Sequence, residues 1–460
     1  MKYPKKETVI LVPYPAQGHV TPMLKLASVM VTWGFRSVVV MPEFIHRQIS
    51  TTSHQNEILC MSIPDGLEEG AHRDFGAIEM AMENNMPCHL EGVIRKLDEE
   101  EDGGVACLVV DLLASWAINV ANQCGIQVAG FWPAMLATYR LIEAIPYMLQ
   151  KGIISETGTP QHQGPICFEP EKPTLSTEDL PWLIGTLAMR NLRFMFWTRT
   201  LDRSRSLPWL IINTFPGEDC HVNLTSGCLN SPRVYEVGPL SSHATSKDTT
   251  SFWEEDMSCL DWLDIHDDGT VVYISFGSWV SPIGEGKVRS LALALEASGR
   301  PFIWVLGHTW REGLPVGYLE RVGKQGKVVS WAPQLEVLQH EAVGCYLTHC
   351  GWNSTLEAIQ CKKRLLCYPV AGDQFVNCYY IANVWQVGVR ICGFGEKDVE
   401  QGIKSVMEDE EMNQRLEKLN ERILGKEARL RVVDNFSAFI GGLRNMRMDS
   451  PTEDNQGPNV

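Results

Sequence analysis

The chain has 460 residues, of which 44% are hydrophobic and 21% are charged, and this composition is that of an ordinary globular protein. Because a single hydrophobic core stops growing at roughly 250–300 residues, the length predicts two large domains with room for a sizeable buried site. The formal net charge of −16 argues against a nucleic acid or an anionic membrane as a partner, because either would repel the net field.

Short apolar runs alternate with amphipathic stretches along the first half of the chain. The runs, in chain order, are TVILVPYP, RSVVVMP, ILCMSIP, VACLVVDL and IQVAGFWP. Continuous apolarity in short runs, with amphipathic segments between them, is typical of parallel strands that helices cover on both faces. The pattern restarts in the second half with TVVYISFGS, PFIWVLG, KVVSW, GCYLTHC and RLLCYP. The sequence therefore predicts an α/β protein with two doubly wound, Rossmann-like domains.

Composition places the boundaries of these domains. Residues 216–269 are rich in Ser, Pro, Gly, Asp and Thr, which suits an exposed linker. We expect an N-terminal domain over residues 1–240 and a C-terminal domain over residues 254–429. A charged helix at about residues 430–447 is expected to pack back on the first domain, and residues 448–460 are expected to form a disordered tail.

The 14 cysteines are scattered without a C-x-x-C motif, and most lie in apolar runs. This pattern indicates buried, reduced thiols and predicts a cytoplasmic protein. The opening residues lack the apolar length and the cleavage site of a signal peptide, and no segment approaches the roughly 18 apolar residues that a membrane span needs. We expect no membrane insertion, and we also expect a monomer.

Polar residues follow the predicted strand GCYLTHC in the second domain. In open parallel sheets ligands bind beyond the carboxyl ends of the strands, so these positions are candidates for a binding site. Gly351 allows a ligand to approach closely, and Asn353 and Ser354 begin a predicted helix whose free N–H groups and dipole favour an anion such as phosphate. His349 adds a further donor. The alternative is that Asn353 or Ser354 only caps its own helix.

Four further residues lie near strand or helix ends in this domain. Glu357 lies four residues beyond Asn353 on the same helical face and could accept hydrogen bonds from ribose hydroxyls, or could be a solvated carboxylate. Trp331 follows a strand and could stack on a base, although a packed core position is the alternative. Asp373 and Gln374 offer acceptors and donors for sugar hydroxyls, and Asp373 could equally be an N-cap.

Two residues of the first domain form a candidate catalytic pair. His19 lies just beyond the first predicted strand at the start of a helix, where the helix dipole disfavours imidazolium and should help to keep the ring neutral. Asp111 ends the run VACLVVD and is expected at the same edge of the sheet, where a carboxylate could orient the imidazole and stabilise its cation. The alternative is an exposed loop histidine without a catalytic role.

The residues from Trp331 to Gln374, taken in their order, resemble the signature of plant family 1 UDP-dependent glycosyltransferases, and the resemblance extends over nearly the whole chain. It implies the GT-B fold, in which two such domains face each other and the C-terminal one binds the UDP-sugar, here UDP-glucose. The roles that it implies are uracil binding by Trp331 and Ala332, ribose binding by Gln334 and Glu357, diphosphate binding by Ser278, His349, Asn353 and Ser354, and sugar binding by Trp352, Asp373 and Gln374.

The reaction that the resemblance implies is inversion at the anomeric carbon of the sugar. His19 takes a proton from the acceptor while the acceptor attacks opposite the departing UDP. No D-x-D motif occurs in the chain, so we expect no metal and a metal-independent hexosyltransferase. The charge of the leaving diphosphate would then be met by the residues of the diphosphate site and by a helix N-terminus.

The acceptor is less evident from the sequence. The stretches GFWPAML and LRFMFW could line an apolar cleft for a flat phenol, although composition favours core positions for many of these side chains. Over its whole length the chain resembles plant enzymes that glucosylate flavones at carbon 8, and this resemblance implies carbon attack on a flavone. O-glucosylation of a flavonoid or another small phenol is the alternative.

Two other classes of protein remain open. A nicotinamide oxidoreductase would also be doubly wound, but VILVPYPAQGH lacks the G-x-G-x-x-G turn of dinucleotide-binding domains. A non-enzymatic UDP-sugar sensor would keep the C-terminal residues but would not need His19 and Asp111.

Overall fold

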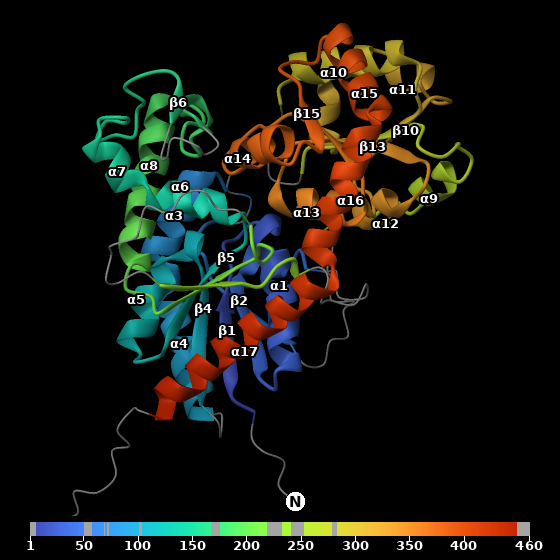
Figure 1. Ribbon diagram of the computed structural model, residues 1–460. Coiled ribbons are helices and arrows are strands. Elements are labelled where there is room, and N and C mark those ends of the chain that lie inside the picture. The colour runs from blue at the N-terminus through green and yellow to red at the C-terminus, as the bar shows by residue number, and fades with distance from the viewer. Residues whose placement is uncertain are drawn as a thin grey trace, which may run out of the picture.

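The structure is a computed structural model, and it describes residues 6–49, 58–68, 70, 73–100, 104–166, 175–218, 232–240, 253–277 and 283–448. In this part the chain forms two α/β lobes, each built on a parallel sheet (Figure 1). The carboxyl ends of the strands in the first sheet are directed at the second lobe. This architecture confirms the predicted fold class.

The first lobe contains a seven-stranded parallel sheet with the order β3-β2-β1-β4-β5-β8-β9. Its central strands are buried on both faces, as continuous apolar runs require. The strands are β1 (Thr8–Val12), β2 (Arg36–Pro42), β3 (Ile58–Ile63), β4 (Val105–Asp111), β5 (Val128–Trp132), β8 (Trp209–Ile212) and β9 (Arg233–Glu236), with a separate pair β6 (Pro165–Ile166) and β7 (Leu175–Ser176). The helices are α1 (Gln17–Thr32), α2 (Glu43–His46), α3 (Phe75–Asn84), α4 (Met86–Glu100), η1 (Leu112–Ala114), α5 (Trp116–Gln123), α6 (Leu136–Glu143), α7 (Ile145–Gln150), η2 (Thr177–Asp179) and α8 (Leu187–Ser204).

The second lobe contains a six-stranded parallel sheet with the order β12-β11-β10-β13-β14-β15. The strands are β10 (Val271–Ser275), β11 (Phe302–Val305), β12 (Gly326–Val329), β13 (Val343–Thr348), β14 (Arg364–Cys367) and β15 (Gly388–Arg390). The helices are α9 (Ser258–Leu263), α10 (Glu285–Ser298), η5 (His308–Gly313), α11 (Tyr318–Arg321), α12 (Gln334–Gln339), α13 (Trp352–Gln360), α14 (Gln374–Tyr379), η6 (Tyr380–Val384), α15 (Glu396–Glu408) and α16 (Glu410–Leu424), followed by α17 (Lys426–Met448).

Both sheets reverse their winding direction beside their first strand. β1 lies between β2 and β4, and β10 lies between β11 and β13. At such a point the loops that follow two neighbouring strands diverge, and they leave space for a ligand at the carboxyl edge. The loops after β1 and β4 can therefore form one half of a site, and the loops after β10 and β13 can form the other half.

Three short strands are not evident from the sequence, namely β8, β9 and β15. They span four, four and three residues, which is too short for a clear apolar run. β9 also lies within residues 216–269, where composition suggests an exposed linker, and it pairs in parallel with β8 at the edge of the sheet. This segment is therefore not a linker throughout its length.

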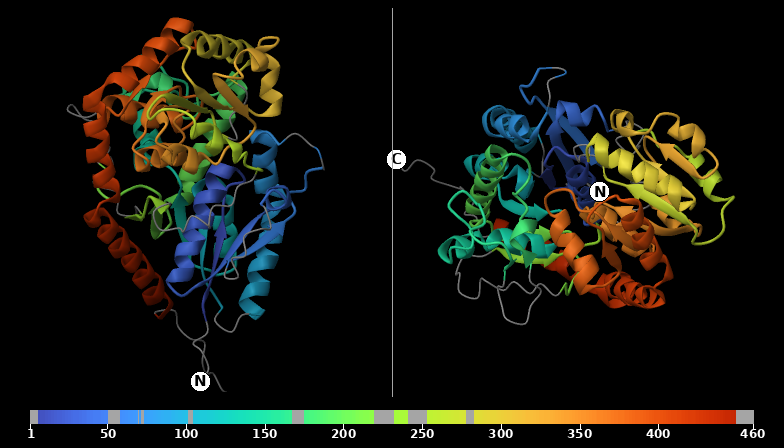
Figure 2. Two further views of the ribbon diagram at one scale, coloured as in Figure 1. Left: turned by 90° about the vertical axis from the view of Figure 1, so that its right-hand side faces the viewer. Right: turned by 90° about the horizontal axis from the view of Figure 1, so that it is seen from above.

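The last helix crosses from the second lobe to the first. α16 contacts α13 and β14, whereas α17 contacts β4 and β9. Figure 2 shows α17 running along the outside of the first lobe. The side chains of α17 that join the core of this lobe are Val432, Phe436, Phe439, Ile440 and Leu443. The domain boundaries at residues 240 and 254 stay predictions, and residues 449–460 of the expected tail lie outside the described residues.

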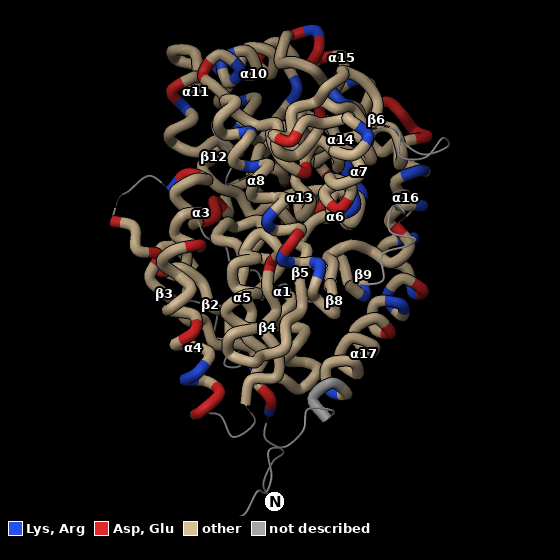
Figure 3. The backbone as a smooth tube through the Cα atoms, turned by 90° about the vertical axis from the view of Figure 1, so that its left-hand side faces the viewer, with Lys and Arg blue, Asp and Glu red and all other residues tan. Residues whose placement is uncertain are grey.

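The described helices, cysteines and surface charges bear on the remaining expectations from the sequence. None of the helices in the described part combines the length and the hydropathy that crossing a bilayer requires. The described cysteines are all free. Figure 3 shows acidic and basic residues on both lobes, with the two signs interspersed.

Replacing Phe439 with alanine is expected to destabilise the first lobe. The ring is fully buried, and its centroid lies 5.9 Å from that of Trp209 and 5.7 Å from that of Tyr235, both in edge-on contacts. Loss of such a side chain costs about 3–5 kcal/mol, which urea denaturation would show as an earlier transition. Leu430→Ala is the matched control, because Leu430 lies on the same helix but is 55% exposed. An equal effect of both changes would contradict the packing of α17 on this lobe.

Candidate active site

His19 and Asp111 lie together at the carboxyl edge of the first sheet. Asp111 is the last residue of β4, and His19 is the third residue of α1, which follows the neighbouring strand β1. His19 Nδ1 lies 2.7 Å from Asp111 Oδ2, and the Asp111 side chain is 0% exposed whereas that of His19 is 23% exposed. The backbone N–H groups of Tyr14 and Leu113 donate to the same carboxylate at 3.4 and 3.0 Å. Asp111 is thus fixed, and it leaves His19 Nε2 as the nitrogen that can take up a proton.

The pKa shift of His19 has the opposite direction to the one expected from the helix dipole. Burial lowers the pKa of His19, but the charge of Asp111, the hydrogen bond to it and the charge of Asp373 together outweigh burial. The pKa is therefore raised above its ordinary value rather than lowered. The neutral ring that can accept a proton becomes the main form only at a higher pH than for a free histidine.

His349 follows β13, and its ring lies between two glycines. A Cβ at Gly277 or Gly351 would lie 2.6 or 2.5 Å from His349 Nε2, so only glycine leaves space for the ring. His349 is 7% exposed, and within the described part its buried Nδ1 has no hydrogen-bond partner. Burial lowers the pKa of His349 to about 4, so the ring is neutral near pH 7. Such a ring can donate one N–H to an anion, but it brings no positive charge.

The N-terminus of α13 is open to a ligand. Gly351 is the N-cap residue, and no side chain caps the helix. This excludes the alternative that Asn353 or Ser354 only caps its own helix. Asn353 Nδ2 instead donates to the backbone carbonyl of Gly18 in the first lobe at 2.9 Å. The uncapped N–H groups and the positive end of the helix dipole can therefore receive an anion.

Gln334 connects the residues around this helix. Its Nε2 donates to Glu357 Oε2 at 2.8 Å and to Ser354 Oγ at 3.1 Å. Its Oε1 accepts hydrogen bonds from the hydroxyls of Tyr273 and Tyr346 at 3.2 and 3.1 Å. The amide of Gln334 is therefore used within the protein, where it fixes the positions of Glu357 and Ser354.

Trp331 and Ala332 lie in the loop between β12 and α12. The indole of Trp331 is half-buried, and its centroid lies 6.3 Å from that of Trp253, with 44° between the ring planes. Ala332 is buried. Trp331 is therefore not the fully packed core residue of the alternative reading, and a half-buried indole at this edge can receive a planar base.

Asp373 and Gln374 lie at the start of α14. Asp373 is the N-cap residue, but its side chain does not cap the helix, and its Oδ2 accepts a hydrogen bond from Asn377 Nδ2 at 2.8 Å. Gln374 is 8% exposed, and its Oε1 accepts hydrogen bonds from the backbone N–H groups of Val370 and Ala371 at 2.9 and 2.8 Å. The orientation of this amide is therefore fixed, and its Nε2 remains as a donor for a ligand.

Trp352 forms a contact between the lobes. Its Nε1 donates to the backbone carbonyl of Asn213 at 2.6 Å, and its indole stacks on Phe215 with the ring centroids 6.4 Å apart. The side chain is 4% exposed. A contact between Trp352 and a sugar, as the resemblance implies, could therefore come only from its backbone.

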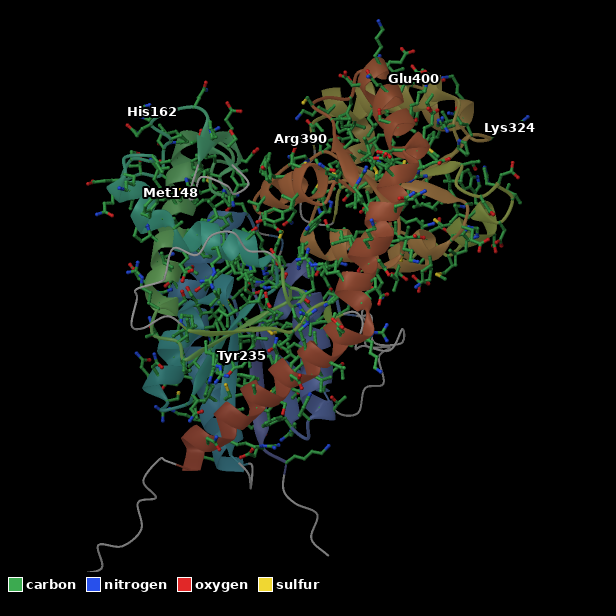
Figure 4. All side chains as sticks on the ribbon, viewed as in Figure 1. Met148, His162, Tyr235, Lys324, Arg390 and Glu400 are labelled. Carbon is green, nitrogen blue, oxygen red and sulfur yellow. The ribbon has the colours of Figure 1, made fainter. Side chains whose placement is uncertain are left out.

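Further contacts bring the two halves of the site together. Burial raises the pKa of Asp373, and the charge of His19 in the other lobe acts in the opposite direction. Arg390, labelled in Figure 4, lies 3.5 Å from Asp179 of the first lobe. The residues that line a pocket between the lobes are Pro22, Lys25, Asn213, Asn353, Leu356 and Glu357. The catalytic pair of the first lobe and the N-terminus of α13 therefore lie close to each other across the interface between the lobes.

Several residues of this arrangement were not predicted from the sequence. Asn213 and Phe215 follow β8, so the rule that ligands bind beyond strand ends could have indicated them. Gly277 follows β10 in the same way. Asn377 donates both to Asp373 and to the carbonyl of Cys350, at 2.8 and 2.9 Å, and nothing in its spacing indicates this role.

Two further predictions concern a phosphate contact of Ser278 and the residues that could hold a metal. Ser278 lies outside the described residues, so its contact with a phosphate stays a prediction. Within the described ranges, the group of His, Cys, Asp or Glu residues close enough together to hold a metal consists of Cys350, Cys367 and Cys378, which are all buried. Asp111, Glu357 and Asp373 belong to no such group among the described residues.

Comparisons with known proteins bear on this site. Residues 247–423 match the family described as "UDP-glucoronosyl and UDP-glucosyl transferase". UDP-glycosyltransferase 82A1 of Arabidopsis thaliana is 53% identical over 458 residues, which cover 95% of this chain and 98% of that protein. A flavonol 3-O-glucosyltransferase of the same plant is 30% identical, with 89% and 90% of the two chains covered. The crystal structure of a UDP-glucose: anthocyanidin 3-O-glucosyltransferase in complex with UDP matches with a TM-score of 0.81 at 24% identity, over 97% of this chain and 100% of that one.

Replacing Asp111 with asparagine is expected to lower the pKa of His19. The substitution removes the negative charge that favours imidazolium, while the burial that disfavours it remains. NMR titration of the histidine ring protons would show the change, and the His19→Gln variant would assign the signal. Asp373→Asn is the matched control and should lower the pKa by less, because its charge contributes less. An unchanged pKa in the Asp111→Asn variant would contradict the interaction.

Proposed function

The chain belongs to the UDP-glycosyltransferase family, and from this premise we propose that it transfers glucose from UDP-glucose, with inversion, to a small phenolic acceptor. Membership makes it a glycosyltransferase that uses a UDP-sugar donor, and it removes the sensor and the oxidoreductase from consideration. The rest of the proposal depends on one observation. His19 and Asp111 of the first lobe lie close to Asp373 and to the N-terminus of α13, which belong to the second lobe.

The donor would lie along the carboxyl edge of the second sheet. The half-buried indole of Trp331 supports uracil binding, and the fixed carboxylate of Glu357 supports ribose binding. The uncapped N–H groups of α13 support binding of the diphosphate. So does the buried Nδ1 of His349, which has no hydrogen-bond partner among the described residues, because a buried polar atom without a partner is costly. Gln374 Nε2 and Asp373 would then hold sugar hydroxyls.

His19 would act as the general base. Its neutral Nε2 takes the proton of the acceptor hydroxyl, the acceptor atom bonds to the anomeric carbon, and the bond from that carbon to the UDP oxygen breaks on the opposite face. Asp111 stabilises the imidazolium that forms. Because only the neutral ring is a base, transfer should increase with pH through the raised pKa of His19.

The leaving diphosphate would be stabilised by hydrogen bonds rather than by a divalent cation. His349 is neutral, so the helix N-terminus and the N–H donors around it would meet the developing charge. The described carboxylates of the site do not gather into a cation site, which supports metal-independent turnover. We also propose that the enzyme is cytoplasmic and monomeric, and the free cysteines of the described part support a reducing compartment.

The acceptor atom distinguishes two forms of this proposal. Carbon attack at position 8 of a flavone follows from the sequence resemblance alone. The flavonol and anthocyanidin enzymes described above are named as 3-O-glucosyltransferases, and this likeness favours oxygen attack on a flavonoid as the second candidate. Deprotonation by His19 serves both, because the charge of a phenolate is shared between its oxygen and the ortho carbons of the ring.

Replacing His19 with alanine is expected to reduce transfer by roughly 10²–10⁴-fold, the usual contribution of a general base. Transfer from UDP-glucose to a flavone would be measured by chromatography, with and without EDTA, and we expect the wild-type rate to survive chelation. Binding of UDP, measured by calorimetry, should be nearly unchanged because the donor residues lie in the other lobe. Intact turnover in His19→Ala would remove the general-base role, and full dependence on added Mg²⁺ or Mn²⁺ would contradict metal independence.

Acid treatment of the flavone product is expected to separate carbon from oxygen attack. A C-glycoside has no acetal and should survive hot dilute acid, whereas an O-glycoside should release the aglycone. Mass spectrometry before and after treatment gives the answer. Quantitative release of the aglycone would contradict carbon attack and would leave O-glucosylation as the function.

A further inference from the structure

Three arginines of α8 face α3, and two of them form ion pairs with glutamates of α3. Arg199 pairs with Glu79, and its Nε lies 3.4 Å from Glu83 Oε1. Arg203 makes a two-pronged pair with Glu83, with both N–O distances at 2.8 Å. Arg193 occupies the corresponding position nearer the start of the helix, where α3 offers the ring of Phe75 instead of a carboxylate.

Arg193 has no counter-charge in the described part of the chain. Its guanidinium carbon lies 4.3 Å from the centroid of the Phe75 ring, and its Nε is buried without a hydrogen-bond partner among the described residues. The side chain is half-buried, and burial lowers its pKa. Tyr14 is the group whose charge would act on it, but burial raises the pKa of Tyr14 above its usual range, so the phenol stays neutral. A partly desolvated cation without an anion is unfavourable, and an anionic ligand would relieve that cost.

This cation lies near the catalytic pair. Its charge acts on Tyr14, whose ring centroid is 5.2 Å from that of His19 and whose backbone N–H donates to Asp111. α8 also contacts η1, the turn that directly follows Asp111. Figure 1 shows α3, α6 and α8 next to one another in the first lobe. A small aromatic molecule with its hydroxyl at His19 could therefore extend toward Arg193.

We propose that Arg193 is a binding subsite for a carboxylate of the acceptor, so that the preferred acceptors are phenolic acids rather than uncharged phenols. This inference rests on the proposed function, because it places the acceptor hydroxyl at His19. The guanidinium matches a carboxylate with two parallel N–H···O bonds, and Phe75 holds its plane. The carboxylate is held and does not react, and the phenolic oxygen or ring carbon remains the nucleophile.

Two other oxygens of the first lobe could receive hydroxyl groups of a ligand but not its charge. Gln17 Oε1 at the start of α1 and Asn191 Oδ1 on α8 are both buried without a hydrogen-bond partner in the described ranges. Both can accept a hydrogen bond from a hydroxyl but would repel a carboxylate oxygen. Arg193 therefore gives the subsite its selectivity for an anion.

The test compares 4-hydroxycinnamate with its methyl ester as acceptors, using the full chain and saturating UDP-glucose. The variants are Arg193→Gln, Arg193→Lys and the control Arg190→Gln, which removes one charge from an exposed position on the same helix. Mild base treatment of the product distinguishes a phenolic glucoside from a glucose ester. Calorimetry of 4-methoxycinnamate and its methyl ester measures binding without any transfer.

We expect the wild type and Arg190→Gln to prefer the acid over the ester by about 10–100-fold in kcat/KM, which corresponds to one charge-assisted contact. Arg193→Gln should lose this preference mainly through a higher KM for the acid, and Arg193→Lys should restore part of it. Equal use of acid and ester by the wild type, or an equal loss of both in Arg193→Gln, would overturn the inference while leaving glucosylation intact. Selective binding of the acid that is lost in Arg193→Gln, without any transfer, would support the subsite and count against the proposed reaction.

Discussion

The hydrogen bond between His19 and Asp111 depends on the order of strands in the first sheet. The two residues are 92 positions apart, and they meet because β1 and β4 are neighbours at the point where the sheet reverses its winding direction. The backbone N–H of Tyr14 donates to the same carboxylate oxygen as His19, and the backbone N–H of Leu113 donates to the other one. The second sheet repeats the same order, and there His349 and the open end of α13 occupy the equivalent edge. One topological rule thus builds both halves of the site.

The contacts between the lobes decide how these halves face each other. Asn353 binds the carbonyl of Gly18, next to His19, and Trp352 binds the carbonyl of Asn213. Both residues belong to the first turn of α13, the same turn that offers its N–H groups to an anion. The separation between His19 and the N-terminus of α13 is therefore set by the same helix that, in the proposed function, would bind the donor.

The sequence predicts the long apolar strands, and it predicts candidate site residues at the ends of these strands. Both predictions depend on local pattern and spacing. It does not predict β8, β9 and β15, which are too short to show a pattern. It also gives the wrong direction for the pKa shift of His19. Burial lowers this pKa, but the charge of Asp111, the hydrogen bond to it and the charge of Asp373 outweigh burial, and this balance depends on tertiary packing. The use of the Trp352 side chain between the lobes depends in the same way on tertiary packing. So does the buried Nε of Arg193, which has no hydrogen-bond partner among the described residues.

The crossing of the chain from α16 to α17 constrains how substrates can enter and leave. α17 is anchored in the core of the first lobe, while α16 stays with the second. Between them lies Gly425, where a Cβ would meet the carbonyl oxygen of Glu421 at 2.3 Å. The two lobes are therefore joined at this junction by a single short turn of the chain. A side chain at position 425 would displace the end of α16, so the space between the lobes depends on this glycine.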